Sequence, residues 1–515
     1  MRILFIYPRM LINVGNGNML PTAALSLASF MQQEGHVVRV CDRSIDRGSV
    51  SQVIDAFQPD VLACTLMFAQ QIADMQAVCR EVRALRPGLP ILCGGLTASL
   101  IPETILKEGL ADYVGVGEGE YTLLELLEVV SGQREPSTVQ SLVYLDRDGQ
   151  PARTPLRPFA DLGDFPETDF SLLPMDKYFA YYPQAPRTMS VYASKGCPGH
   201  CTFCLNAAYH RCQYRPRKRE TVMRELEALA ADYGADGFAF FDELWGMDKQ
   251  DLRAYCDDIA ALSAKLGRPV RWVCETRVGM LDLEDLERMA RAGCFLILFG
   301  MESGSPEILE RMKKGYPLER LETDINNCKL VGISTMPTAI LGFPGETPAQ
   351  IRQTVHLIFR LNPTFYSTSL FSAIPGTAEY NRLVSAGRLT PPTDLAGWAA
   401  WESDRTLPAN YAAVPDRELK VINCFFQWRM LFQNRGDRKT GRLDYLGMAL
   451  RRAAGKIGRK GAFAFFLKHL RFAFHVAWHY YAYPGIRRKY DLYPRSFGRR
   501  DWDDLSHLQD ITHAD

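Results

Sequence analysis

Short apolar runs alternate with helical patterns along the first 140 residues. The expected strands are residues 3–7, 37–41, 61–65, 90–93 and 113–116. The expected helices are residues 22–33, 72–85 and 121–130. Apolar strands separated by helices predict an α/β fold with a parallel, Rossmann-like doubly wound sheet. Ligands of such sheets bind beyond the carboxyl ends of the strands.

A second strand–helix series follows further along the chain. Its six expected strands are residues 190–194, 237–241, 270–274, 295–300, 335–341 and 365–371. Six successive βα units predict a partial (β/α)6 TIM-type barrel, whose site lies at the carboxyl ends of the strands. The pattern divides the chain into 1–140, a proline-punctuated linker at 141–189 with a hairpin near 142–145, the barrel at 190–380, and a helical, basic region at 381–515.

Composition places the chain among globular proteins. Of its 515 residues, 47% are hydrophobic and 23% are charged. The first residues lack the order of an export signal, and no apolar run reaches the about 18 residues that a membrane span needs. The thirteen cysteines are an odd number spread through strands and helices, which favours a reducing cytoplasm over a disulfide framework.

Three cysteines form the strongest motif. Cys197, Cys201 and Cys204 follow the first barrel strand with C-x3-C-x2-C spacing. Three thiolates on one tight loop are suited to an iron–sulfur cubane and leave its fourth iron open for another ligand. A structural zinc site with His200 as fourth ligand is the alternative, but no second pair of ligands follows as in most such sites.

This motif resembles that of the radical S-adenosylmethionine (SAM) superfamily. The resemblance implies a [4Fe-4S] cluster whose open iron binds SAM, and cleavage of SAM to a 5′-deoxyadenosyl radical. It further implies an external electron donor of flavodoxin or ferredoxin type. Phe203, just before the last cysteine, is similar to the residue that this superfamily places beside the adenine.

Polar or glycine-containing segments at later strand ends are similar to the SAM-binding segments of the same superfamily. The implied contacts are Asp242 and Glu243 with the amino group, Glu302 and Ser303 with the ribose, Gly342 with the adenine, and Arg277 with the carboxylate or substrate. Helix-capping acids and a structural ion pair are the alternatives for individual residues. The argument depends on their order along the chain, since each follows a strand.

The N-terminal region resembles the cobalamin-binding domain of B12-dependent radical SAM enzymes of the class B methyltransferase type. It lacks both G-x-G-x-x-G and a P-loop lysine. The residues that match the cobalamin-binding loops are Gly94, Gly95, Thr97, Gly117, Glu118 and Gly119. D-x-H-x-x-G is missing, and His36 precedes a strand, so we expect no histidine below the cobalt. A degenerate domain that only contacts the barrel is the alternative.

The C-terminal region is basic and aromatic. Between Arg435 and Arg500 there are 17 Lys or Arg residues and three Asp residues. Residues 451–489 combine basic clusters with an aromatic run, a pattern typical of a helix on an anionic membrane surface. A helix packed on the barrel remains the alternative. No nucleic-acid module is recognised, so we expect no nucleic-acid partner.

Together these resemblances imply a C-methyltransferase that uses the [4Fe-4S] cluster, SAM and methylcobalamin on an unactivated carbon. The expected substrate is a small molecule or lipid, such as a hydrophobic natural product, and the expected location is the cytoplasm or the inner membrane face. A B12-dependent cyclase or ring-rearranging enzyme of porphyrin or secondary metabolism is the alternative. An RNA methylthiotransferase is less favoured, because Cys41, Cys64, Cys79 and Cys93 do not share one ligand loop.

Overall fold

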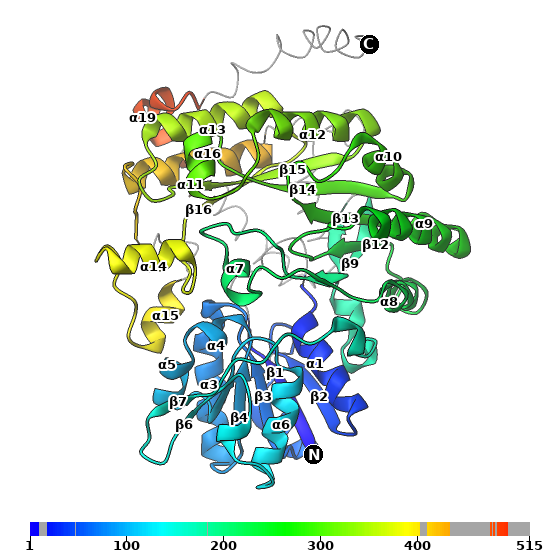
Figure 1. The fold of residues 1–515 in the computed structure, drawn as a ribbon, viewed down its shortest axis with the longest axis vertical. Coiled ribbons are helices and arrows are strands. Elements are labelled where there is room, and N and C mark those ends of the chain that lie inside the picture. Colours follow the sequence, from blue (N-terminus) through cyan, green and yellow to red (C-terminus); the bar gives the residue numbers. More distant parts are fainter. Residues whose placement is uncertain are drawn as a thin grey trace. The chain divides into compact units, whose positions relative to one another are not determined.

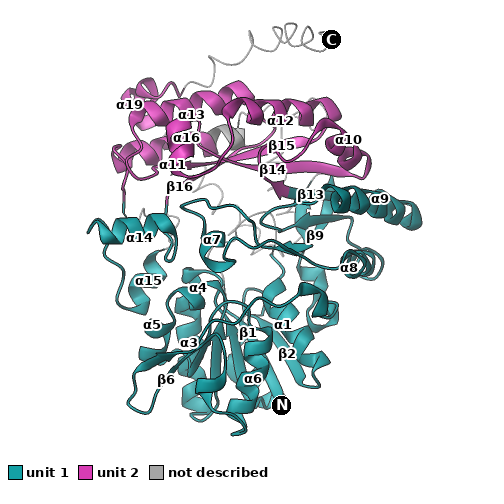
Figure 2. Cartoon of the chain, viewed as in Figure 1, with its two compact units in different colours: residues 1–274, 372–409 teal, residues 275–371, 410–515 magenta. Residues whose placement is uncertain are grey.

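The structure, a computed structural model, describes residues 1–9, 18–46, 48–182, 184–401, 409–432, 474–475, 477–478 and 481–492. Contacts divide the chain into two compact units (Figure 2). Unit 1 comprises residues 1–274 and 372–409, and unit 2 comprises residues 275–371 and 410–515. The domain boundaries expected from the sequence stay predictions.

Unit 1 begins with a seven-stranded sheet of order β2-β1-β3-β4-β5-β6-β7 (Figure 1). Its strands are β1 (Arg2–Tyr7), β2 (Val37–Asp42), β3 (Val61–Thr65), β4 (Ile91–Gly94), β5 (Tyr113–Gly115), β6 (Leu142–Leu145) and β7 (Pro151–Arg153). The first five are parallel, and β6 and β7 add an antiparallel hairpin. Strand β3 is buried along its whole length, as expected where helices cover both faces of a parallel sheet. The predicted doubly wound sheet is confirmed.

The strand order places a crevice in this sheet. From β1 the chain passes to β2 on one side and then to β3 on the other, so connections diverge at the carboxyl ends of β1 and β3. Such a switch point opens a ligand site in doubly wound sheets. The helices of this region are α1 (Thr22–Gln33), α2 (Val50–Phe57), α3 (Ile72–Leu85), α4 (Leu96–Leu100), α5 (Pro102–Lys107) and α6 (Glu120–Val130).

The same unit holds the first barrel strands. Strand β9 (Ala185–Val191) pairs in parallel with β12 (Gly237–Phe240), which pairs in parallel with β13 (Arg271–Thr276). An antiparallel strand, β8 (Ala180–Tyr182), lies on the other side of β9. The connecting elements are β10 (Ser194–Lys195), α7 (Leu205–Tyr209), β11 (Arg215–Pro216), α8 (Arg219–Ala231) and α9 (Lys249–Leu266).

A late segment of the chain returns to unit 1. It contains α14 (Ala378–Ser385) and α15 (Leu395–Trp401), and α15 packs against α3. The Leu395 amide donates to Glu108 Oε1 at 2.7 Å, and the Glu379 amide donates to Thr202 O at 2.9 Å. Residues 372–409 therefore complete the unit that the N-terminus begins.

Unit 2 holds the remaining expected barrel strands. Strand β15 (Ser334–Leu341) pairs in parallel with β14 (Cys294–Glu302) and with β16 (Ser367–Leu370). The helices are α10 (Leu283–Arg291), α11 (Pro306–Arg311), α12 (Leu318–Val331), α13 (Pro348–Leu361), α16 (Asp416–Phe432) and α19 (Pro484–Lys489). Five of the six expected barrel strands are present near their expected positions, and the first, expected at 190–194, is β9 at Ala185–Val191. Strand β13 begins in unit 1 and ends in unit 2.

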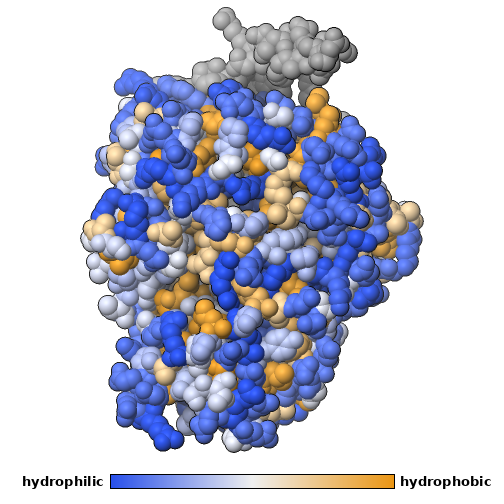
Figure 3. Space-filling view, in the orientation of Figure 1, coloured by the Kyte–Doolittle hydropathy of each residue, from blue (hydrophilic) through white to orange (hydrophobic). Residues whose placement is uncertain are grey.

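Most of the aromatic segment expected at 451–489 lies outside the described residues, and α19 is its main described element. Within the part of the chain that the structure describes, no helix is long and apolar enough to span a membrane. Hydrophilic side chains cover most of the face drawn in Figure 3. In the described C-terminal segment, Phe474, Trp478 and Tyr481 are large hydrophobic side chains that remain more than half exposed.

Candidate active site

The three cysteines lie on the loop between β10 and α7. All three are partly buried, and Cys204 is the residue that precedes α7. The loop is held by a backbone hydrogen bond, in which the Cys204 amide donates to Cys201 O at 3.1 Å, and by the side chain of Asn206 on α7, whose Nδ2 donates to Cys197 O at 3.1 Å. Gly196 opens the loop with a φ of +84°, where a Cβ would collide with Gln213 O. Only glycine fits this entry to the loop without strain.

The donors on this loop fit an iron–sulfur cluster. Across the described residues, no three His, Cys, Asp or Glu side chains are gathered closely enough to hold a metal ion as they stand. The assignment therefore rests on donor chemistry, namely three accessible thiols within eight residues. The alternative zinc ligand, His200, has its Nδ1 3.2 Å from the sulfur of Cys212.

Asp242 and Glu243 follow β12 and meet the strand that leads into this loop. Asp242 is 2% exposed and accepts hydrogen bonds from the Ala193 amide and from Ser194 Oγ. Burial raises the pKa of Asp242 to about 7 despite these hydrogen bonds. Asp242 is thus fixed to the backbone before the loop, whereas its neighbour reaches the loop itself.

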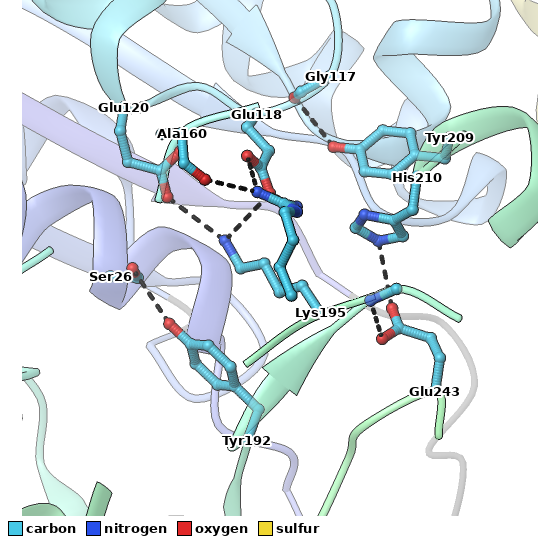
Figure 4. Close-up of polar contacts among 12 residues, drawn as sticks. Ser26, Gly117, Glu118, Glu120, Ala160, Tyr192, Lys195, Tyr209, His210 and Glu243 are labelled. Carbon is cyan, nitrogen blue, oxygen red and sulfur yellow. Dashed lines mark hydrogen bonds and ion pairs between the residues drawn. The ribbon is translucent and has the colours of Figure 1, made fainter. Parts of the chain in front are cut away.

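Glu243 accepts a hydrogen bond from the Gly196 amide at 2.9 Å, next to Cys197. Its Oε1 lies 3.3 Å from His210 Nε2 (Figure 4). Burial alone would raise the pKa of Glu243, but the contact with His210 holds it below its usual value. Of the two predicted acids, Glu243 is therefore better placed to meet a ligand at the cysteine loop.

A cavity of about 330 Å³ lies within unit 1. One wall consists of the strand ends of the N-terminal sheet, from Phe5 on β1 through Thr65 on β3 to Gly94 on β4. The opposite wall comes from the segments around the cysteine loop, including Tyr192, Lys195, Tyr209, His210, Phe241 and Glu243. The cavity thus occupies the switch-point crevice at the carboxyl ends of β1 and β3 and extends to the base of the cysteine loop.

Most of the residues predicted to bind cobalamin meet at this cavity. Gly94, Gly95, Gly117, Glu118 and Gly119 line it. At Gly95 the φ is +94°, and a Cβ would lie 2.7 Å from Leu66 O, so a close turn requires glycine. Thr97 differs: it is buried, and its amide donates to Leu66 O at 2.9 Å. Glycines let a flat ligand approach the backbone closely, and doubly wound sheets bind their ligands at these strand ends, so the lining suits a corrinoid.

A polar network joins the two walls of the cavity (Figure 4). Lys195 and Arg215 face each other across the β10–β11 pair, and both reach Glu118, at 3.7 Å and 2.5 Å. Lys195 Nζ also lies 3.5 Å from Glu120 Oε1. Tyr209 donates its hydroxyl to Gly117 O at 2.9 Å.

The cations of this network determine the direction in which the pKa of Glu118 is shifted. Its burial would raise its pKa, but Arg215 and Lys195 hold the pKa below its usual value. Glu118 is therefore a paired carboxylate in the cavity wall.

His210 was not identified from the sequence. It is 8% exposed and lies against Glu243, and its Nδ1 is buried without a hydrogen-bond partner among the described residues. The next two residues, Arg211 and Cys212, have φ values of +51° and +55°, a conformation that such side chains rarely adopt. Neither the strained backbone nor the contact with Glu243 can be recognised from residue spacing in the sequence. The one available signal was that His210 follows the cysteine motif closely in the chain.

The other predicted SAM-binding residues lie in unit 2, where each has protein partners. Glu302 lies 3.0 Å from Lys314 Nζ, and Ser303 is fully buried with its hydroxyl 3.2 Å from Thr354 Oγ1. The Gly342 amide donates to Glu346 Oε2 at 2.7 Å.

Arg277 hydrogen-bonds Lys314 O, so Lys314 is a partner common to Arg277 and Glu302. All of these residues lie near strand ends as expected. Their roles toward SAM stay predictions.

Comparison with known proteins supports both halves of this site. Residues 191–358 match the Radical SAM superfamily, and residues 8–127 match the B12 binding domain. The chain is 28% identical over 362 residues to an uncharacterized methyltransferase of Pyrococcus horikoshii, and the alignment covers 69% of this chain and 77% of that protein. It is 25% identical over 395 residues to the anaerobic magnesium-protoporphyrin IX monomethyl ester cyclase of Rubrivivax gelatinosus, covering 74% and 70% respectively.

A solved structure has the same fold. It is the radical S-adenosylmethionine methyltransferase TsrM from Kitasatospora setae, with cobalamin and a [4Fe-4S] cluster bound. The TM-score is 0.67 at 19% identity, over 95% of this chain and 99% of that chain. The B12 binding domain binds cobalamin, and the radical SAM domain binds SAM at a [4Fe-4S] cluster. The chain is therefore a radical SAM enzyme with a cobalamin-binding domain, of the methyltransferase-like class.

Proposed function

We propose that this protein is a C-methyltransferase that methylates an unactivated carbon of a small molecule. The observation that carries the proposal is the cavity of unit 1, because residues of the B12 binding domain and residues beside the cysteine loop line one space. A corrinoid held there would lie next to the segment that carries the cluster ligands. When bound, the cluster and SAM supply a radical that removes a hydrogen atom from carbon, and cobalamin supplies the methyl group.

The chain's own residues bind and position these groups. Cys197, Cys201 and Cys204 hold the cluster, and Glu243 receives the amino group of SAM next to the Gly196 amide. The glycines of the loops after β4 and β5 let the backbone approach the corrinoid. The apolar side of the cavity, which includes Met19, Leu20 and Leu123, excludes water from the reacting carbon.

The first experiment measures cofactors and label transfer together. Protein is purified and reconstituted without oxygen, with hydroxocobalamin supplied, and is then given methyl-deuterated SAM and a reductant. We expect iron near four per chain, a corrinoid absorption band, and deuterated methyl on the bound cobalamin with S-adenosylhomocysteine released. Iron without corrinoid, or label that never leaves SAM, would contradict methyl transfer, and zinc in place of iron would overturn the cluster.

We further propose a hydrophobic substrate taken at the inner face of the membrane by a cytoplasmic enzyme. Phe474, Trp478 and Tyr481 are 69%, 59% and 58% exposed. Helix α19 adds Arg487 and Arg488 nearby in the sequence, whereas Lys489 is paired with Glu418 at 2.7 Å. Exposed aromatic side chains with adjacent cations suit an anionic lipid surface. Co-sedimentation with vesicles containing phosphatidylglycerol, compared with phosphatidylcholine alone, tests this contact.

An external flavodoxin- or ferredoxin-type protein is proposed as electron donor.

A cyclase is the second candidate. The relative from Rubrivivax gelatinosus is a cyclase and matches 74% of this chain, so domain order does not separate the two reactions. The same labelling experiment distinguishes them once a candidate substrate is added. A cyclase forms its new bond within the substrate and leaves the deuterated methyl group out of the product, whereas a methyltransferase places it on the product carbon.

A further inference from the structure

Lys195 is a cation in the cavity wall with a hydrogen-bond donor to spare. An ammonium carries three N–H donors. Among the described residues, Lys195 Nζ makes one hydrogen bond, to Glu120 Oε1 at 3.5 Å, and lies 3.7 Å from Glu118 Oε1 (Figure 4). Its side chain is 22% exposed and lines the cavity. Its ammonium also lies 5.8 Å from the ring centres of Phe165 and Tyr192. With one donor directed to each carboxylate, one N–H donor is left to meet a ligand.

The charges around Lys195 restrict which ligand group it can bind. Two cations, Lys195 and Arg215, face two carboxylates, Glu118 and Glu120, so the cluster is neutral as it stands. An anionic group such as a carboxylate or phosphate would bring a third negative charge to two carboxylates in a partly buried site, which is unfavourable. A neutral acceptor, such as an amide carbonyl oxygen, would satisfy the free donor without disturbing this balance.

Cobalamin offers such acceptors, because primary amides surround its corrin ring. We propose that Lys195 is a cobalamin-binding residue that donates a hydrogen bond to an amide carbonyl on the corrin rim. Lys195 belongs to β10, two residues before Cys197, and lies outside the matched B12 binding domain at 8–127. The polypeptide that holds the cluster thus supplies part of the cobalamin site. The inference rests on the proposed function only through the use of cobalamin, and is independent of methyl transfer.

The variants must separate a lost hydrogen bond from a broken ion pair. Lys195→Met alone would leave Glu120, which is 4% exposed, without its cation. The test variant is therefore Lys195→Met combined with Glu120→Gln, which keeps side-chain volume and net charge. The double variant is compared with Glu120→Gln alone, which keeps the ammonium of Lys195, so that the two proteins differ only at that residue. Lys218→Met is the control, because Lys218 donates to Gly163 O on the exposed surface.

Dissociation constants are measured by absorption titration of the anaerobic holoprotein with hydroxocobalamin and with cobinamide. Cobinamide keeps the amide rim and lacks the nucleotide tail. We expect the double variant to bind both corrinoids about tenfold to thirtyfold more weakly, as for loss of a charged hydrogen-bond donor. Glu120→Gln and Lys218→Met should stay within about threefold of wild type, and affinity for S-adenosylhomocysteine and iron content should not change.

Three results would overturn the proposal. Unchanged corrinoid affinity in the double variant would show that Lys195 makes no contact. A loss seen with hydroxocobalamin but not with cobinamide would move the contact to the nucleotide tail. An equal loss of S-adenosylhomocysteine affinity would indicate a general disturbance of the site. A wild-type protein that binds neither corrinoid would contradict the proposed function itself, so the two failures are distinguishable.

Discussion

The two units treat the polar residues at their strand ends in different ways. In unit 1, Glu118, Lys195 and Glu243 line a cavity, so each of them faces open space as well as its protein partner. In unit 2, Ser303 is fully buried against Thr354, and Glu346 closes on the Gly342 amide. A polar residue at a strand end is thus a weak indicator of a ligand contact, and its partners decide between ligand binding and loop support.

The largest expected effect is on the cysteine loop of unit 1. We expect Cys201→Ala to lower bound iron from about four per chain to below about one, since a cubane with two protein thiolates is not retained. Iron and labile sulfide analysis after anaerobic reconstitution measures this. Cys212→Ala is the control, because Cys212 lies beyond the motif beside His200. Equal iron in both variants would argue against the assigned ligands.

Glycine substitutions sharpen the contrast between the two units. Gly196→Ala should reduce iron loading more than tenfold, because the Cβ meets backbone at Gln213 O and the loop must move. Gly342→Ala should cost about 1–2 kcal/mol of stability for its φ of +85° and leave iron loading intact, because its Cβ meets only the flexible Leu419 side chain. Iron content and thermal unfolding separate the two outcomes. Loss of iron from Gly342→Ala as well would contradict this expected difference between the two units.

The buried carboxyl of unit 2 gives a pH-dependent prediction. Burial raises the pKa of Glu346 from 4.5 to about 7, so the folded state favours its protonated form. Its contribution to the free energy of unfolding is therefore fully present below pH 4.5 and is lost as the pH rises to about 7. Glu346→Gln should remove this loss and raise stability above pH 7 by up to about 3 kcal/mol relative to wild type.

Chemical denaturation of wild type and Glu346→Gln at pH 5 and pH 8 measures this difference. The gain of the variant should shrink as the pH falls. Glu319→Gln, at an exposed position in the same unit, is the control and should show no such dependence. A gain of the same size at both pH values would indicate a packing effect rather than a titration.

The smallest expected difference compares two acids assigned to SAM. Glu243→Gln should weaken S-adenosylhomocysteine binding about tenfold, since a charged acceptor for the ammonium is lost. Glu302→Gln should weaken it about threefold or less, because Lys314 already occupies the Glu302 carboxylate. Calorimetric titration of the reconstituted protein measures both constants. The reverse order would place the tighter SAM contact in unit 2.

The fold was predictable where the local pattern of residues along the chain determines it. The apolar residues Val61 to Cys64 of β3 indicated a buried parallel strand, and the three cysteines within eight residues indicated a cluster loop, without any tertiary information. The ion pairs of the cavity were not predictable, because Glu118 and Arg215 are 97 residues apart and no local propensity encodes their meeting. For the same reason the sequence identified Glu118 by its loop but missed the cations that pair with it.

Unit 1 is discontinuous in the sequence, and this affects how the protein is made. Residues 372–409 supply α14 and α15, so the unit that contains the cavity is incomplete until the ribosome has passed residue 409. Chains grow at about 5–20 residues per second and fold from the N-terminus onward. The nascent N-terminal sheet therefore exists for tens of seconds without the helix that packs on α3. The cavity itself is lined only by residues between Phe5 and Glu243, so its walls are synthesised before this helix. A gene split between residues 274 and 372 would therefore leave the cavity on one fragment and place α14 and α15 of the same unit on the other.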